Sequence, residues 1–290
     1  MATKTFSGNR FSTFTDTDTQ EWKGLFDELK KFSDDYLKAL RKHNLWPANY
    51  YWPQDSLMTN TRVWEYPYVL DILNKYAQGG KLLDIGSALT FLPYFLSHKG
   101  YEVFSLDYDQ QMVDWSADIR KKLDQVDPGF SYKPLSSYAQ GDVTDLQFQD
   151  ESFDIVTNVS VLEHLPFDMI MKSADSVYRV LKKGGIFICT LDCLVSGDGN
   201  AEHMPLNDVQ FKEFLNILTN KFELVEENVS SSPDALMTNK KKLFDRNKEE
   251  SPKTLRQRVG VARRMVWDKN YNTADNSLEW TAYGFTLRKV

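Results

Sequence analysis

The strongest constraint on the fold is a strand–helix–strand pattern over residues 81–109. A short apolar run, 82–85, has the length of a buried strand and is followed at once by Gly86. An amphipathic segment comes next, and a second apolar run, 103–106, ends in Asp107. A turn glycine after the first strand and a carboxylate about 20 residues later are typical of a βαβ unit that holds the ribose of a cofactor.

The glycine loop distinguishes two classes of cofactor. A dinucleotide site needs G-x-G-x-x-G, because the pyrophosphate lies against bare backbone. The loop here reads DIGSALT and keeps only Gly86. S-adenosylmethionine (SAM) has no pyrophosphate, and its ammonium group needs an acceptor such as Asp84. The loop therefore favours SAM, with Asp84, Gly86 and Ser87 at its amino-acid end and with Asp107 and Tyr108 at its ribose.

Composition narrows the class of protein. The 290 residues are 26% charged and 41% hydrophobic, as in soluble globular proteins with one decorated domain or a domain and a small cap. The net charge of −6 argues against nucleic acid as partner. Cys189 and Cys193 are too few for a disulfide framework or a zinc site. We therefore expect no bound metal. Because the sequence shows no signal pattern and no run of 18 apolar residues, we also expect a cytoplasmic protein that contacts no membrane.

The first 62 residues predict a cap. Residues 1–18 are rich in Thr, Ser and Asp and are expected to be frayed or extended, whereas 19–41 carry an apolar stripe at helical spacing. Residues 45–68 are rich in Trp and Tyr, and three prolines should prevent a continuous helix there. These rings can line a ligand site or simply anchor the cap. Arg62 can pair with the SAM carboxylate or be an ordinary surface side chain.

Three further strands are expected beyond the βαβ unit. The run 138–143 ends with Asp142 and Val143, which suit the amine and the ring of adenine. The run 153–160 leads into His164, and the run 186–191 ends at Asp192.

Four motifs in this order resemble class I SAM-dependent methyltransferases, in particular their bacterial small-molecule branch. They are LLDIGSALTF, the acidic end of FSLDYD, QGDVTDLQFQDESFDIVTNVSVLEHL and LKKGGIFICTLD. The resemblance covers about 62–225 and implies an α/β fold, a Rossmann-like seven-stranded mostly parallel sheet with helices on both faces. It also places Asn158 and Val159 at the cofactor. The family loop usually reads G-x-G-x-G, whereas this chain has Ala88 and Thr90 at the second and third positions.

The resemblance also divides the chain. The SAM-binding core is expected over 63–230, and its final strand over 276–290, antiparallel to the sixth. A basic insertion, 231–275, separates the two. Between residues 240 and 269 it carries eleven Lys and Arg against four Asp and Glu, a local charge of 11 − 4 = +7. We expect it to form either a solvated covering helix or a site for a phosphate- or carboxylate-bearing substrate or an acidic partner.

The expected activity is direct transfer of the SAM methyl group to oxygen or nitrogen of a small-molecule acceptor. His164, Asp192 and His203 are the candidate catalytic residues, because each follows a strand at the edge where open α/β sheets bind ligands. The alternatives are a nucleic-acid or protein methyltransferase and a catalytically silent SAM-binding protein. The strand end at Asn158 lacks the Asn/Asp-Pro-Pro-Tyr/Phe element of base-modifying members, and the retained acidic residues argue against a silent protein.

Overall fold

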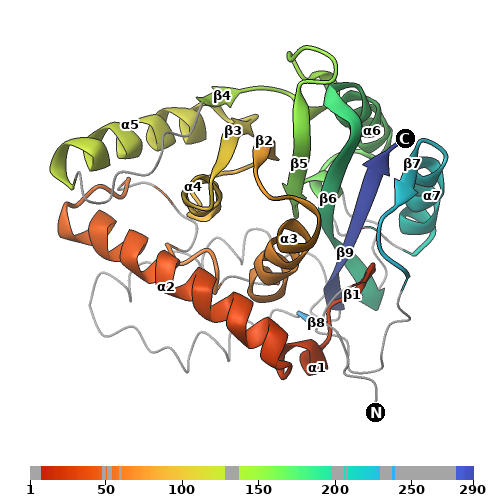
Figure 1. Ribbon diagram of the computed structural model, residues 1–290, viewed down its shortest axis with the longest axis horizontal. Coiled ribbons are helices and arrows are strands. Elements are labelled where there is room, and N and C mark those ends of the chain that lie inside the picture. Colours follow the sequence, from red (N-terminus) through yellow and green to blue (C-terminus); the bar gives the residue numbers. More distant parts are fainter. Residues whose placement is uncertain are drawn as a thin grey trace.

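The computed structural model describes residues 8–47, 50, 54–58, 61–127, 137–196, 206, 208–228, 237–238 and 279–290. They form one mixed sheet with helices on both faces (Figure 1). The strands are β1 (Arg10–Phe11), β2 (Gly80–Ile85), β3 (Tyr101–Asp107), β4 (Ser137–Gln140), β5 (Phe153–Val159), β6 (Leu181–Ser196), β7 (Phe222–Leu224), β8 (Met237–Thr238) and β9 (Glu279–Lys289). The helices are α1 (Phe14–Thr17), α2 (Gln20–Lys42), α3 (Arg62–Tyr76), α4 (Leu92–His98), α5 (Gln110–Val126), α6 (Phe167–Val180) and α7 (Asp208–Thr219), with short 3-10 turns η2 (Val143–Asp145) and η3 (Leu162–His164).

The sheet order is β1-β9-β6-β5-β2-β3-β4, and β7 and β8 also pair with β9. Strands β4, β3, β2, β5 and β6 are parallel, and β9 is antiparallel to both β6 and β7. The expected Rossmann-like fold is therefore confirmed, including the antiparallel last strand. Two two-residue strands, β1 and β8, extend the seven that the resemblance implies.

Alternating residues of the strands enter two separate cores. Helices α2 to α5 cover one face, and α6 and α7 cover the other (Figure 1). The period of two in a strand explains the division, because neighbouring side chains point to opposite faces. Leu82, Ile155 and Ile186 lie in the first core, and their successors Leu83, Val156 and Phe187 lie in the second. Both faces are apolar, so these strands read as continuous hydrophobic runs in the sequence.

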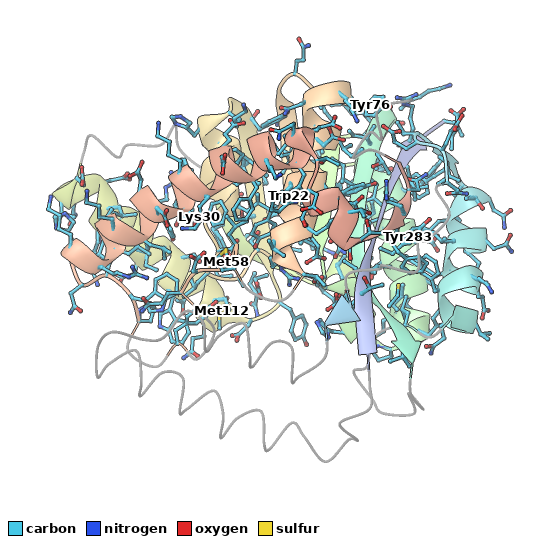
Figure 2. The ribbon with its side chains drawn as sticks, turned by 90° about the horizontal axis from the view of Figure 1, so that it is seen from below. Trp22, Lys30, Met58, Tyr76, Met112 and Tyr283 are labelled. Carbon is cyan, nitrogen blue, oxygen red and sulfur yellow. The ribbon has the colours of Figure 1, made fainter. Side chains whose placement is uncertain are left out.

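Helix α3 contains a proline that another helix accommodates. Pro67 lacks the N–H that would bond to the carbonyl four residues earlier, that of Val63. The indole Nε1 of Trp22 on α2 donates to this carbonyl at 3.2 Å, and Trp22 lies where α2 runs alongside α3 (Figure 2). As expected, no continuous helix runs through the described residues of 45–68, but α3 begins at Arg62 and includes Pro67, because a long-range donor replaces the missing one.

The N-terminal segment 8–18 is docked rather than frayed. Strand β1 pairs with β9 at Tyr283 and Gly284, and Tyr283 lies beside this segment in Figure 2. Asn9 is fully buried. Its Nδ2 donates to the carbonyl of Glu226 at 2.5 Å, and its Oδ1 accepts the N–H of Thr286 at 2.9 Å. The polar composition that suggested fraying instead satisfies backbone groups at the sheet edge.

Candidate active site

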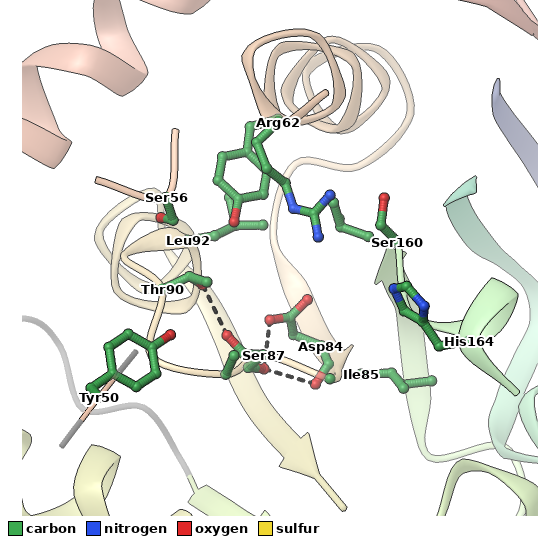
Figure 3. A pocket seen from close by; sticks show the side chains of 14 residues that line it. Tyr50, Ser56, Arg62, Asp84, Ile85, Ser87, Thr90, Leu92, Ser160 and His164 are labelled. Carbon is green, nitrogen blue, oxygen red and sulfur yellow. Dashed lines mark hydrogen bonds between the residues drawn. The ribbon is translucent and has the colours of Figure 1, made fainter. Parts of the chain in front are cut away.

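A cavity of about 190 Å³ lies at the carboxyl ends of β2 and β5 (Figure 3). Ligands of open α/β sheets bind at this edge. One wall comes from the glycine loop after β2, another from α3, and a third from the loop after β5. The lining residues are Tyr50, Ser56, Arg62, Tyr66, Asp84, Ile85, Gly86, Ser87, Ala88, Thr90, Leu92, Val159, Ser160 and His164.

The glycine loop keeps a left-handed backbone although a glycine is replaced. Gly86 has φ 68°, and a Cβ there would lie 2.4 Å from Val161 Cγ2, so glycine is required. Ala88 has φ 43° at the position where the family has its second glycine. Its N–H donates to Asp107 Oδ2 at 3.0 Å, and its carbonyl accepts the Tyr138 hydroxyl at 2.5 Å. Side chains from β3 and β4 therefore hold the conformation that glycine would otherwise permit.

Asp84 places a buried carboxylate at the cavity. Its Oδ2 accepts the Ser87 hydroxyl at 2.6 Å, and its Oδ1 accepts the Thr157 hydroxyl at 2.7 Å; the bond to Ser87 is drawn in Figure 3. Burial raises the pKa of Asp84 to about 6, against the effect of these two donors. A bound ammonium group would favour the charged form.

Behind the wall formed by Arg62, Ser160 and His164 lies a group of buried carboxylates, which we call the acidic cluster: Glu65, Glu163 and Asp192. Glu65 is fully buried and accepts four donors. These are Arg62 Nη1 at 2.6 Å, Thr61 Oγ1 at 3.0 Å, Ser160 Oγ at 2.5 Å and Thr190 Oγ1 at 2.6 Å. Glu65 thus connects two cavity-lining side chains to the interior.

The other two members of the acidic cluster receive less support. Glu163 Oε1 accepts the backbone N–H of Asp192 at 3.1 Å, and Thr61 Oγ1 lies 3.1 Å from Asp192 Oδ1. Among the described residues, Glu163 Oε2 is buried with no hydrogen-bond partner. Burial raises the pKa of both groups, and repulsion by Glu65 raises them further. Searching the same residues finds no group of three His, Cys, Asp or Glu arranged to hold a metal ion.

The residues proposed from the sequence fall into three sets. Arg62, Asp84, Gly86, Ser87, Val159 and His164 line the cavity, whereas His203 and the basic insertion 240–269 lie outside the described residues. The third set lies outside the cavity lining and consists of Asp107, Tyr108, Asp142, Val143, Asn158 and Asp192. The carboxylate of Asp107 accepts the N–H of Ala88, and Tyr108 is 76% exposed. Asp142 caps η2, Val143 is buried, and the Asn158 side chain donates to Cys189 Sγ.

Sequence reasoning missed Ser160, Glu65 and Glu163 and left the roles of two tyrosines open. Tyr50 and Tyr66 belong to the aromatic stretch that the sequence left open between ligand site and anchor, and both line the cavity. Ser160 has φ 48°, a strained conformation that no local signal announces. Glu65 and Glu163 each lie between apolar residues in the sequence. An acidic residue within an apolar run is the signal that could have predicted a buried carboxylate at these two positions.

Comparison with known proteins identifies the class. Residues 83–189, from β2 into β6, match the family described as "Methyltransferase domain". They form a class I SAM-dependent methyltransferase domain, and SAM is the cofactor of that class. No described helix is long and apolar enough to cross a membrane.

Two curated relatives and one solved structure illustrate the similarity. A probable S-adenosylmethionine-dependent methyltransferase of Mycolicibacterium smegmatis is 28% identical over 148 residues, 51% of this chain and 49% of the relative. The ubiquinone/menaquinone biosynthesis C-methyltransferase UbiE of Bartonella bacilliformis is 25% identical over 131 residues, 44% and 47% of the two chains. The chain thus spans about half the length of these relatives. The crystal structure of the MccD protein shares the fold, with a TM-score of 0.53 at 16% identity over 80% of this chain and 99% of that one.

Proposed function

We propose that this protein transfers the methyl group of SAM to a small-molecule acceptor bound in the cavity. The observation that carries the proposal is the position of this cavity. It joins the glycine loop after β2, the place of the cofactor in this class, to a wall of aromatic and polar side chains outside the parallel core. A cofactor and a second small molecule can therefore meet at the carboxyl ends of β2 and β5.

The residues present fit SAM. The carboxylate of Asp84 suits the ammonium group, because it is buried, acidic and directed to the cavity. The guanidinium of Arg62 has five N–H donors, of which one bonds to Glu65, so it can also bind a carboxylate. Asp107 at the end of β3 is the candidate for the ribose hydroxyls, and the exposed ring of Tyr108 follows it. Asp142 and Val143 remain the proposed adenine side, and Asn158 and Val159 remain proposed cofactor contacts.

The chemistry expected of the chain is positioning. SAM supplies an electrophilic methyl group when bound, so the protein needs to align the acceptor and exclude water. His164 lines the cavity and is the proposed group that contacts the acceptor's proton. Asp192 lies behind it, in the acidic cluster, where burial raises the pKa of Asp192 and the charge of the facing His164 lowers it. His203 stays a sequence-based candidate.

The acceptor class rests on the cavity. Its walls carry the rings of Tyr50 and Tyr66 and the hydroxyls of Ser56 and Thr90, which suit an aromatic or polar small molecule. We also propose that the acceptor carries a phosphate or carboxylate group, and the only support for this narrower proposal is the positive charge of the basic insertion. We propose O- or N-methylation, because either needs the proton handling that His164 can provide.

Calorimetric titration with SAM tests the proposal. Binding should weaken at least tenfold in Asp107→Ala, because charge-assisted hydrogen bonds contribute about 1.5–3 kcal/mol. Asp109→Ala is the matched control, since Asp109 is on the same loop but caps α5 through Gln111 N–H. Absence of SAM binding to the wild type at millimolar ligand would contradict the proposed function.

A further inference from the structure

The acidic cluster holds more negative charge than its described surroundings neutralise. Three carboxyl groups, each at most 8% exposed, lie around the single guanidinium of Arg62. Leaving such a charge buried and unpaired costs several kcal/mol, so a proton is the readiest compensation. The arrangement thus favours a carboxylic acid somewhere in the cluster.

The hydrogen bonds indicate where this proton resides. Thr61 has one hydroxyl hydrogen but lies within bonding distance of both Glu65 and Asp192. An ionised carboxylate only accepts. If Thr61 donates to Glu65, its contact with Asp192 is a hydrogen bond only when Asp192 carries a proton and donates it. The geometry therefore accommodates an acid at Asp192.

Glu163 and Asp192 together are called the carboxylate pair, and one carboxylate oxygen of Glu163 lacks a hydrogen-bond partner within the part of the chain that the structure describes. Glu163 Oε2 is buried without a hydrogen-bond partner among the described residues, while Oε1 takes the Asp192 N–H. A buried orphan acceptor is rare, because it has lost its hydrogen bonds to water and gained none in the protein. A proton on Glu163 would remove the negative charge from this carboxyl group, so either Glu163 or Asp192 can be the group that carries the proton.

The groups that face this pair come from three elements. Helix α3 contributes Arg62 and Glu65, η3 contributes His164, and β6 contributes Cys189, whose pKa burial raises so that it stays a neutral thiol. Arg62 and His164 also line the cavity. A change of charge in the cavity is therefore felt by the pair across one layer of side chains.

We propose that Glu163 and Asp192 share one proton in the free protein, release it when the cationic sulfonium of SAM binds, and take up the acceptor's proton when methyl transfer leaves the sulfur neutral. The inference rests on the proposed function. In the transfer step the bond between sulfur and the methyl carbon breaks, and its electron pair stays on sulfur. The acceptor's lone pair forms the new bond to carbon, and its proton passes by way of His164, which lines the cavity, to the carboxylate pair. The positive charge lost from sulfur is thus balanced by one carboxylate becoming an acid.

The test compares proton release on binding of SAM and of S-adenosylhomocysteine, which lacks the methyl group and the positive charge. Calorimetric titrations in two buffers of different ionisation enthalpy, near neutral pH, count the protons released by each ligand. SAM should release more than S-adenosylhomocysteine, by a fraction of one proton. The difference should vanish at alkaline pH, where both carboxyl groups are already ionised.

Substitutions of Glu163 and Asp192 test whether the released proton comes from this carboxylate pair. The difference should be lost in Glu163→Gln and in Asp192→Asn and kept in Glu213→Gln, which changes an exposed residue of α7. Equal release for both ligands in the wild type would overturn the inference, as would a difference that persists in both variants. If neither variant folds, the alkaline series of the wild type decides. Failure of SAM to bind at all would instead remove the proposed function, so the two failures are distinguishable.

Discussion

Replacing Trp22 by phenylalanine tests whether α2 supplies the donor that Pro67 removes from α3. The indole N–H reaches the carbonyl of Val63 at 3.2 Å, and the Trp22 side chain is only 8% exposed. Phenylalanine keeps a ring that can stack on Phe26 but has no N–H. The carbonyl of Val63 would then be buried without a partner, which costs about 1–3 kcal/mol of unfolding free energy.

Pro67→Ala provides the second half of a double-mutant cycle. Alanine restores an N–H that can bond to Val63 within the helix. Trp22→Phe should therefore cost about 1 kcal/mol less in the Pro67→Ala background than in the wild type. Loss of ring area is the same in both backgrounds and cancels. Urea unfolding followed by circular dichroism gives the four stabilities, and an equal cost of Trp22→Phe in both backgrounds would refute the explanation.

Two other predictions concern the cavity. Gly86→Ala should lower the unfolding free energy by about 1–3 kcal/mol, because the new Cβ meets Val161 at 2.4 Å. Ala88→Gly should leave it unchanged or raise it by up to about 1 kcal/mol, since it relieves a left-handed φ of 43°; urea unfolding showing the same sign for both would contradict this. The pKa of Asp84 is about 6 when folded against about 3.9 in an unfolded chain, so the unfolded state loses its proton first and stability falls as pH rises between these values. The decline should amount to about 2–3 kcal/mol of unfolding free energy, and Asp84→Asn should lack it because asparagine does not titrate. If the wild type and Asp84→Asn gave parallel profiles of unfolding free energy against pH, the raised pKa of Asp84 would be excluded.

The sequence predicted those parts of the fold that depend on short-range patterns. Apolar runs of four to seven residues became β2, β3 and β5, and periodic spacing became α2 and α5. The antiparallel pairing of the last strand with the sixth followed from the resemblance. The same short-range signals marked Asp84, Gly86 and His164, because each directly follows or ends a strand at the ligand-binding edge.

The rest of the site depends on contacts between distant residues. Glu65 meets Ser160 and Thr190 across sequence separations of 95 and 125 residues, and Thr61 meets Asp192 across 131. No periodicity or spacing encodes such a meeting. Pro67 likewise looked like a helix breaker because the compensating donor lies 45 residues before it. A local rule failed where tertiary structure supplied what the rule assumed to be missing.

The pairing of β9 has a consequence for synthesis of the chain on the ribosome. β9 pairs with β6 along nearly its whole length, and the other edge of β9 pairs with β7, β1 and β8 in turn. Asn9 and its partner Thr286 are 277 residues apart. While translation proceeds, β1 therefore has no strand to join, and residues 186–196 of β6 expose an open edge. The sheet closes on that side only after β9 has left the ribosome, so this edge of β6 is the part of the parallel core that stays unpaired longest.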